Sequence, residues 1–226
     1  MDSKNYIISD CNVCAYYAVM SVLQDSKCVL LSGLSSAGKS HLIKTVENEY
    51  RKHYPDRKVK IEAFEDVINR FLKLTKDEKT DEFYGELITN DLILIEDMKI
   101  EGKTSTQQEV AFWMSKVITA GKSIIISAAD KPRHLSVLTD SASKMCGERF
   151  VHAEMDEPDI KLREKLVDEL EAEVGFCIPL MVKRYIIHST EIPVGSFGNC
   201  IKRIQLLKKQ NENLSEAEMI DSIQRC

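Results

Sequence analysis

Residues 33 to 40 read Gly-Leu-Ser-Ser-Ala-Gly-Lys-Ser, a complete GxxxxGK[ST] motif whose residue types and spacing are those of a phosphate-binding loop. An apolar run, Cys28 to Leu31, precedes the motif, and a helix-forming stretch from His41 follows it. Glycines let the backbone wrap closely around an anion, the amides at the start of a helix direct partial positive charge toward it, and the lysine adds a full charge. The motif therefore predicts a site for the phosphates of a purine nucleoside di- or triphosphate.

The polar residues of this motif have expected roles. The ammonium of Lys39 would neutralise phosphate oxygens, and the hydroxyl of Ser40 would bind a magnesium ion that bridges two phosphates. The alternative interpretation is a turn rich in glycine and serine that joins a strand to a helix and binds no ligand. The residues expected to bind the nucleotide here are Gly33, Ser35, Ser36, Ala37, Gly38, Lys39, Ser40 and His41.

Acidic residues follow two apolar runs that have the character of buried parallel strands. The run Leu92 to Ile95 leads into Glu96 and Asp97, a pair of which one acid would belong to the magnesium shell and the other would orient an attacking water. Asp130 follows the second run, Ser123 to Ser127, at the strand end where open α/β sheets present their ligands. The alternative is that these acids only form solvated turns.

Composition limits the classes of function. The 226 residues carry 31 basic and 36 acidic side chains, a net charge of -5 and a pI near 5.6, so any contact with DNA must be local. No apolar run approaches about 18 residues and no basic, apolar leader opens the chain, so we expect neither a membrane span nor a signal peptide. The seven scattered cysteines suit reduced thiols in the cytoplasm, and Cys11 and Cys14 are expected to be buried thiols rather than a metal or redox pair.

The hydrophobic periods predict an α/β layer followed by a helical region. Up to about residue 155 the pattern alternates between strands and helices, and from Glu157 onward it predicts four helices and needs no strand. We therefore expect a nucleotide-binding α/β domain over residues 1–155 and a helical domain over residues 156–226. Within the first domain, Thr106 and Glu109 have the spacing of a helix capping box.

Six groups of residues, in order along almost the whole chain, resemble motifs of the AAA+ module of the bacterial replication initiator DnaA and its shorter paralogue Hda. The most specific group is residues 91–98 followed by Gly102 to Glu109, which is similar to DxLLIDDI and GKERTQEE. The other matching segments are Asn5 to Asn12 (NFVVGxxN), Lys39 to Leu42 (GK[ST]HL), Ala120 to Lys122 (AGK), Ala129 to Pro132 (SDRP) and Glu148 to Phe150 (SRF).

The resemblance implies a P-loop AAA+ fold, an α/β parallel sheet sandwiched by helices and followed by a small all-helical lid. It implies ATP or ADP with Mg²⁺ as ligands, and it places Tyr6, Ile7 and Ile8 in the segment that folds over the adenine. Asp130 matches the first sensor of the γ phosphate. Arg149 matches the arginine finger that enters a neighbouring subunit's site, the alternative being a surface salt bridge. A finger requires a head-to-tail assembly with another copy of this chain or with a full-length initiator.

Three positions depart from the family pattern. Glu96 stands where the family has Asp, and Gly198 stands at the second-sensor arginine of the lid, unless Lys202 or Arg203 one turn further on takes over its role. Lys103 is the only basic residue kept in the loop that contacts single-stranded DNA, so we expect weak contact there. No helix-turn-helix follows the lid before Cys226, so we expect no sequence-specific DNA binding by this chain.

The leading hypothesis is a DnaA-like, adenine-nucleotide-binding protein, an ATP/ADP switch with weak ATPase activity that regulates initiation of chromosomal replication through contact with the initiator. One alternative is a non-hydrolytic, ADP-bound adaptor of the replication machinery, which Gly198 and Glu96 favour. A second is an ATPase of the helicase-loader type. A small-molecule phosphotransferase has little support because no acceptor-site motif is visible.

Overall fold

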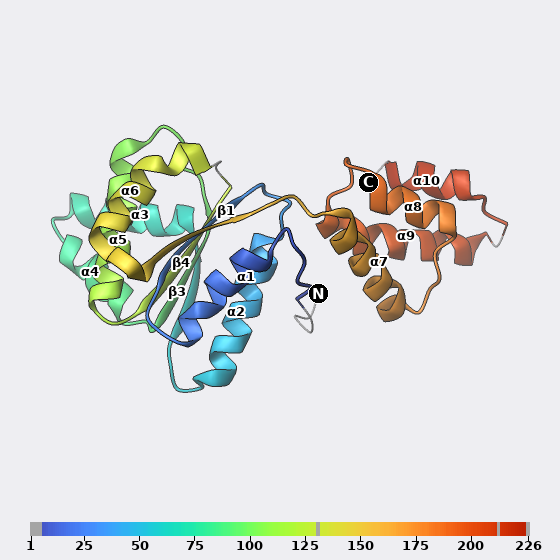
Figure 1. Ribbon diagram of the computed structural model, residues 1–226. Helices are drawn as coiled ribbons and strands as arrows, with labels where there is room; N and C mark the ends of the chain where they lie inside the picture. The colour runs from blue at the N-terminus through green and yellow to red at the C-terminus, as the bar shows by residue number, and fades with distance from the viewer. Residues whose placement is uncertain (1–5, 130–131, 212, 225–226) are drawn as a thin grey trace. The chain divides into compact units, whose positions relative to one another are not determined.

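The computed structural model describes residues 6–129, 132–211 and 213–224 (Figure 1). Contacts divide the chain into two compact units. One unit holds Tyr6 and Cys11–Glu157, and the other holds Ile7–Asp10 together with the residues from Pro158 onward. The short segment 7–10 therefore packs with the helical unit although it precedes the α/β unit in the sequence.

A five-stranded parallel sheet forms the centre of the first unit, which confirms the predicted α/β class. The order of its strands is β2-β3-β4-β1-β5, and because all four pairings are parallel each connection between sequential strands is a crossover. The three central strands are continuous apolar runs because both of their faces are covered. The strands are β1 (Cys28–Gly33), β2 (Val59–Ala63), β3 (Leu92–Met98), β4 (Ser123–Ala128) and β5 (Phe150–Met155).

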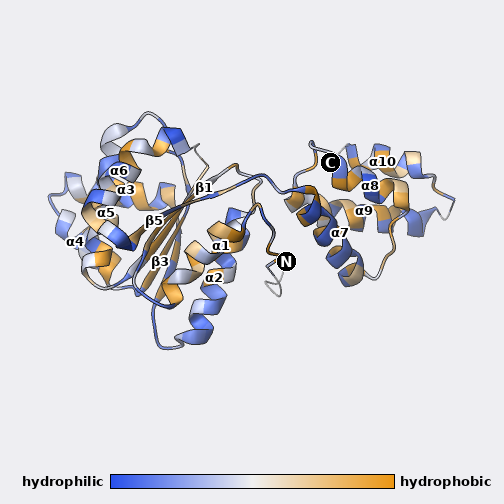
Figure 2. Ribbon diagram, viewed as in Figure 1, coloured by the Kyte–Doolittle hydropathy of each residue, from blue (hydrophilic) through white to orange (hydrophobic). Residues whose placement is uncertain are grey.

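Helices cover both faces of this sheet (Figure 1). Alternate residues of β1 show the division, since Cys28 and Leu30 pack on one face while Val29 and Leu31 pack on the other. Each flanking helix carries both hydrophobic and hydrophilic residues (Figure 2). One face is covered by α1 (Val13–Met20) and α2 (Lys39–His53), and the other by α3 (Phe64–Lys76), α4 (Thr80–Ile88), α5 (Thr104–Thr119) and α6 (Ser136–Cys146).

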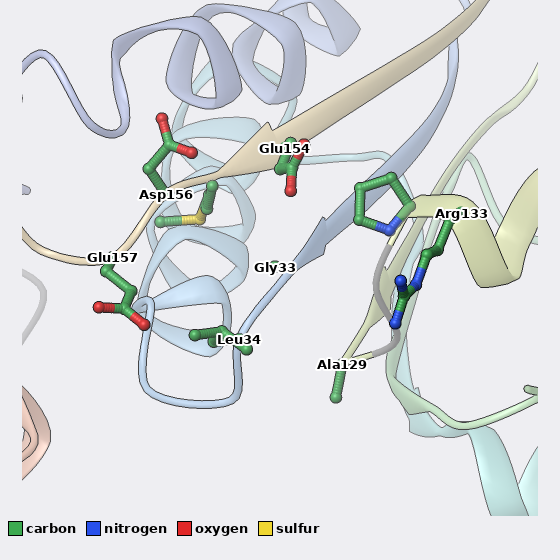
Figure 3. Close-up of a pocket in the computed structure, with 9 residues that line it drawn as sticks. Gly33, Leu34, Ala129, Arg133, Glu154, Asp156 and Glu157 are labelled. Atoms are coloured by element: carbon green, nitrogen blue, oxygen red, sulfur yellow. The ribbon is translucent and has the colours of Figure 1, made fainter.

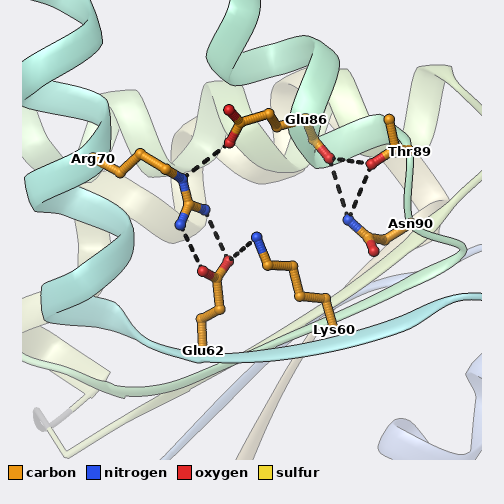
Figure 4. A network of polar contacts seen from close by, with 6 residues as sticks. All are labelled: Lys60, Glu62, Arg70, Glu86, Thr89 and Asn90. Carbon is orange, nitrogen blue, oxygen red and sulfur yellow. Dashed lines mark hydrogen bonds and ion pairs between the residues drawn. The ribbon is translucent and has the colours of Figure 1, made fainter.

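A polar network attaches the edge strand β2 to the helices beside it (Figure 4). Arg70 of α3 donates two hydrogen bonds to the carboxylate of Glu62, at 2.6 and 2.8 Å, and forms an ion pair with Glu86 of α4 at 3.2 Å. Burial acts to raise the pKa of Glu62, but the bonds from Arg70 and Lys60 outweigh it and hold that pKa below its ordinary value. The two-pronged geometry fixes the entry into α3.

In its described residues the second unit contains four α-helices around a separate apolar core, as the sequence pattern predicts. Asp159 caps the first helix by accepting from the Leu162 amide at 2.7 Å, and the Ser9 hydroxyl donates to the same carboxylate at 2.9 Å. That bond attaches segment 7–10 to this unit. The helices are α7 (Ile160–Val174), α8 (Leu180–His188), α9 (Phe197–Gln210) and α10 (Glu216–Gln224).

Arg163 of α7 holds the end of α8 in place. Its guanidinium donates to the carbonyls of Ile186, Ile187, Ser189 and Ile192 and lies 4.8 Å from the ring centre of Phe197, the first residue of α9. A positive charge at a helix C-terminus satisfies carbonyls that lack partners inside the helix. One side chain thereby connects α7, α8 and α9.

Two local predictions are wrong. The capping box of Thr106 and Glu109 does not form, because α5 begins at Thr104 and the Glu109 carboxylate instead accepts from Trp113 and Tyr84, at 2.8 and 2.9 Å. Cys14 is exposed rather than buried, whereas Cys11 is buried as predicted.

Among the residues described, no helix is long and apolar enough to span a bilayer.

Candidate nucleotide-binding site

The phosphate-loop motif lies at the carboxyl end of β1, where the chain turns into α2. Gly33 is the last residue of the strand, Gly38 adopts a left-handed conformation with φ +95°, and α2 begins at Lys39. The first amides of α2 have no carbonyl partners within the helix and point out of its N-terminus. This is the arrangement that binds phosphate at a helix start.

Gly33 is required by close packing as well as by its backbone angle. It pairs with Met155 of β5, and a Cβ atom at residue 33 would lie 2.5 Å from the Met155 carbonyl oxygen. Its φ of +144° is one that residues with side chains rarely adopt. The start of the loop is therefore fixed against the neighbouring strand.

The ammonium of Lys39 is buried within the loop. Lys39 is 4% exposed, and its Nζ donates to the carbonyls of Gly33 and Leu34, each at 2.7 Å. Burial lowers the pKa of Lys39, while the carboxylate of Asp97 opposes that shift. Within the described part of the chain this ammonium has no carboxylate within ion-pairing distance. It is a cation suited to an added anion.

A β-bulge interrupts the pairing of β3 with β4 at Glu96 and Asp97, whereas Glu96 still pairs with Ala63 of β2. The register with β4 runs from Ile95 opposite Ile126 to Met98 opposite Ala128, so β3 has one extra residue there. Asp97 takes a left-handed φ of +59°, and its amide donates to the Ser127 hydroxyl at 3.3 Å. Sequence reasoning missed both the bulge and Ser127, since neither leaves a local pattern.

The groups expected to hold magnesium fit that role chemically. The hydroxyl of Ser40 and the carboxylates of Glu96 and Asp97 form no hydrogen bond or ion pair with any described residue. Hydroxyl and carboxylate oxygens are the hard ligands that Mg²⁺ prefers. A cation could therefore bind these three side chains without breaking any contact that they make with a described residue.

The other residues expected to bind nucleotide are distributed unevenly. Tyr6 lies against His41, with ring centres 5.5 Å apart, and stacks on Tyr16 at 5.6 Å. Burial lowers the pKa of the His41 imidazole, which favours its neutral form. Ile7 and Ile8 belong to the helical unit. Asp130 lies outside the described residues.

A pocket of about 420 Å³ opens beside the loop, at the carboxyl ends of β1, β4 and β5 (Figure 3). Arg133, from the short helical turn Pro132–Leu135, lies on one side of it, and a group of acids after β5 lies on the other. The pocket is lined by Gly33, Leu34, Ala129, Pro132, Arg133, Glu154, Met155, Asp156 and Glu157. No motif in the sequence singles out Arg133.

Arg149 lies at the amino end of β5, whereas the phosphate loop lies at the carboxyl ends of the strands. It immediately precedes β5, whose far end at Met155 pairs with Gly33 of the loop. Five residue steps of a strand separate these ends, about 17 Å at 3.3 Å per residue. Arg149 is exposed, and its guanidinium donates to the Ile118 carbonyl at 3.2 Å. The structure therefore does not bring Arg149 to the phosphate loop of its own chain.

A parallel sheet of order 2-3-4-1-5, with the loop after β1 and acids after β3, defines a P-loop nucleotide-binding protein of the AAA+ class. The family model described as "Bacterial DnaA ATPAse domain" matches residues 2–148. The chain belongs to this family, and its fold and motifs agree with that membership.

Individual relatives agree with the family. The chain is 30% identical over 181 residues to the chromosomal replication initiator protein DnaA of Zymomonas mobilis, an alignment that covers 77% of this chain and 37% of that protein. The DnaA of Thermomicrobium roseum is 24% identical over 90% of this chain and 45% of its own length. The chain thus spans less than half the length of these relatives.

Solved structures show the same fold. Domain III of the Thermotoga maritima replication initiation protein DnaA superposes with a TM-score of 0.77 at 21% identity, covering 96% of this chain and 93% of that one. AMPPCP-bound DnaA from Aquifex aeolicus superposes with a TM-score of 0.73 at 24% identity, covering 93% and 68%.

Replacing Gly33 by alanine is expected to destabilise the α/β unit by about 2–5 kcal/mol, because the added methyl group meets the Met155 carbonyl and the backbone angle is strained. Urea unfolding followed by fluorescence of Trp113, the single tryptophan, reports on this unit. Gly85→Ala is the matched control, since its Cβ meets nothing within 4 Å and it lies inside α4, where alanine adds about 0.5–1 kcal/mol. Equal midpoints for wild type and Gly33→Ala would contradict the packing argument.

Proposed function

We propose that this chain is an adenine-nucleotide switch that binds ATP and ADP, hydrolyses ATP slowly and regulates the initiation of chromosomal replication through contact with the initiator. The observation that carries the proposal is the buried ammonium of Lys39, which has only carbonyl partners in the loop of a DnaA-family domain. The AMPPCP bound by the Aquifex relative supports an adenine nucleotide as the ligand.

The residues of the site have separate tasks in this proposal. Lys39 leaves the carbonyls of Gly33 and Leu34 and donates to phosphate oxygens, while the amides at the start of α2 contact the same anion. Ser40 and Glu96 hold Mg²⁺, which would neutralise phosphate charge when bound. Asp97 accepts a hydrogen bond from the attacking water and orients it. Asp130 senses the γ phosphate, and Tyr6, Ile7 and Ile8 cover the adenine.

Two substitutions separate nucleotide binding from hydrolysis. Lys39→Ala is expected to weaken binding of both ATP and ADP by roughly 10- to 100-fold, because bonds to a charged group are worth about 1.5–3 kcal/mol. Asp97→Asn is expected to retain binding and abolish turnover, since asparagine also tolerates the left-handed backbone at this residue. Calorimetry and phosphate release measure the two effects.

The same measurements test the alternative function. A wild-type protein that retains ADP tightly through purification and shows no phosphate release would be the non-hydrolytic adaptor, a possibility that Gly198 and Glu96 favour. A wild-type protein that binds neither nucleotide and gains no thermal stability from millimolar ATP or ADP would refute both functions.

Assembly through Arg149 is the second part of the proposal. Arg149 is exposed and one strand length from the loop of its own chain, so it can serve only a neighbouring molecule's nucleotide. An interface in which Arg149 of one molecule contacts the nucleotide of the next molecule is a head-to-tail interface. The neighbouring molecule is another copy of this chain or a full-length initiator. Direct DNA contact would be limited to weak binding of a single strand near Lys103.

Mixing the protein with full-length DnaA and ATP is expected to give a complex by size-exclusion chromatography, with less or none in ADP. Arg149→Ala should abolish ATP-dependent assembly and stimulated hydrolysis but leave nucleotide affinity within about twofold, because its guanidinium does not reach the loop of its own chain. Arg184→Ala, an exposed arginine of α8, is the matched control. Absence of a complex with either nucleotide would exclude this partnership.

Gly198 allows a direct test of the lid. A Cβ at residue 198 lies 3.7 Å from Leu170, an ordinary contact, and the backbone there is helical, so a side chain can be introduced without a clash at its Cβ. Gly198→Arg is expected to strengthen ATP binding relative to ADP about tenfold, by restoring the family's second-sensor cation. Gly198→Ala, which changes only helix propensity, should leave the ratio unchanged. An unchanged ratio in Gly198→Arg would show that the lid does not read the nucleotide at this residue.

A further inference from the structure

Arg133 is a cation beside the phosphate loop to which the family motifs assign no role. It lines the pocket that Gly33 and Leu34 also line, and Figure 3 shows it across that pocket from Asp156 and Glu157. Gly33 and Leu34 are the residues whose carbonyls hold Lys39. Arg133 therefore faces the same space as the expected phosphate-binding residues, from the β4 side of the sheet.

A chain of hydrogen bonds orients Arg133. Its Nε donates to Nε2 of His134 at 3.0 Å, which ties one side of the guanidinium to the neighbouring ring. The other ring nitrogen of His134, Nδ1, lies 2.9 Å from the Glu101 carboxylate. Glu101 lies between the acids of β3 and the start of α5. Glu101 and Arg133 thus contact opposite nitrogens of the same ring, so His134 links them and limits where the guanidinium can lie.

The backbone beneath this chain is also fixed. Gln107 of α5 is 3% exposed, and its Nε2 donates to the His134 carbonyl at 2.8 Å. Its Oε1 accepts from the Leu138 amide at 3.0 Å. One buried amide thereby attaches the turn that carries Arg133 to a helix in the core of the α/β unit.

The outer nitrogens of Arg133 remain available. With Nε on His134, the two Nη groups form no hydrogen bond or ion pair with any residue in the described ranges, including the acids across the pocket. A planar guanidinium with two adjacent free nitrogens matches two oxygens of one phosphate group. The pocket therefore contains an oriented guanidinium with two nitrogens available to bind an anion, next to the expected phosphate site.

We propose that Arg133 binds the terminal phosphate of the nucleotide held by its own chain, and so discriminates ATP from ADP in place of the arginine missing at Gly198. His134 is a positioning residue, because it directs the guanidinium without touching the ligand. This inference rests on the proposed nucleotide-binding function. It assigns the discriminating cation to the α/β unit rather than to the lid.

The test compares affinities for AMPPCP and ADP, both with Mg²⁺, by calorimetry. Arg133→Gln is expected to weaken AMPPCP binding about tenfold or more and to change ADP binding by less than about twofold, since ADP lacks the phosphate that the fork contacts. Arg184→Gln removes the same charge from an exposed residue of α8 and should change neither affinity. Thermal unfolding checks that each variant is folded, which the exposure of Arg133 favours.

The positioning role has its own readout. His134→Ala should lose part of the preference for AMPPCP, whereas His134→Gln, whose amide oxygen can still accept from Arg133, should recover it without a matching change in stability. An equal ratio of affinities in wild type and Arg133→Gln overturns the proposal while leaving nucleotide binding intact. Failure of the wild type to bind either nucleotide refutes the proposed function instead, and this inference with it.

Discussion

The buried ammonium of Lys39 is the interaction on which the candidate site depends. A cation that is 4% exposed and contacts two carbonyls has lost much of its hydration, which is why burial lowers its pKa. The fold maintains this arrangement because Gly33 is locked against Met155 and Gly38 supplies the left-handed turn into α2. A folded protein that holds an incompletely compensated charge at the start of a helix has a site in which an anion lowers the free energy.

The strained acid at the end of β3 complements that cation. A left-handed aspartate costs about 1–3 kcal/mol, and such strain persists only where the surrounding structure enforces it. Here the bulge and the Ser127 hydroxyl enforce it, and the carboxylates of Glu96 and Asp97 form no hydrogen bond or ion pair with any described residue. Since β4 alone separates β3 from β1, these two strands lie about 10 Å apart in the sheet. In the proposed function, a phosphate and its metal ion would bind at the carboxyl ends of these strands.

The sequence predicts the features that have a local cause. Apolar runs identified β1, β3 and β4 because strands covered on both faces need apolar residues throughout, and helical spacing identified the four helices of the second unit. The edge strand β2 has no continuous apolar run that would identify it, because its polar residues serve the network around Glu62. Tertiary features left no local pattern: the bulge at Asp97, the packing of segment 7–10 with the helical unit, and the chain from Glu101 to Arg133.

Two arginines in this molecule differ in whose nucleotide they can reach. Arg149 is separated from its own loop by the full length of β5, whereas Arg133 lines the pocket that begins at Gly33. On the proposed assignments, Arg133 reports the terminal phosphate within the chain and Arg149 reports it between chains. Because Gln107 fixes the turn of Arg133 to α5, detection of the terminal phosphate by Arg133 would not depend on the helical unit. If Arg133 binds the terminal phosphate, the helical lid needs no arginine for that purpose and tolerates glycine at residue 198. The proposed role of Arg133 would therefore explain both the missing second-sensor arginine and the guanidinium nitrogens that have no partner among the described residues.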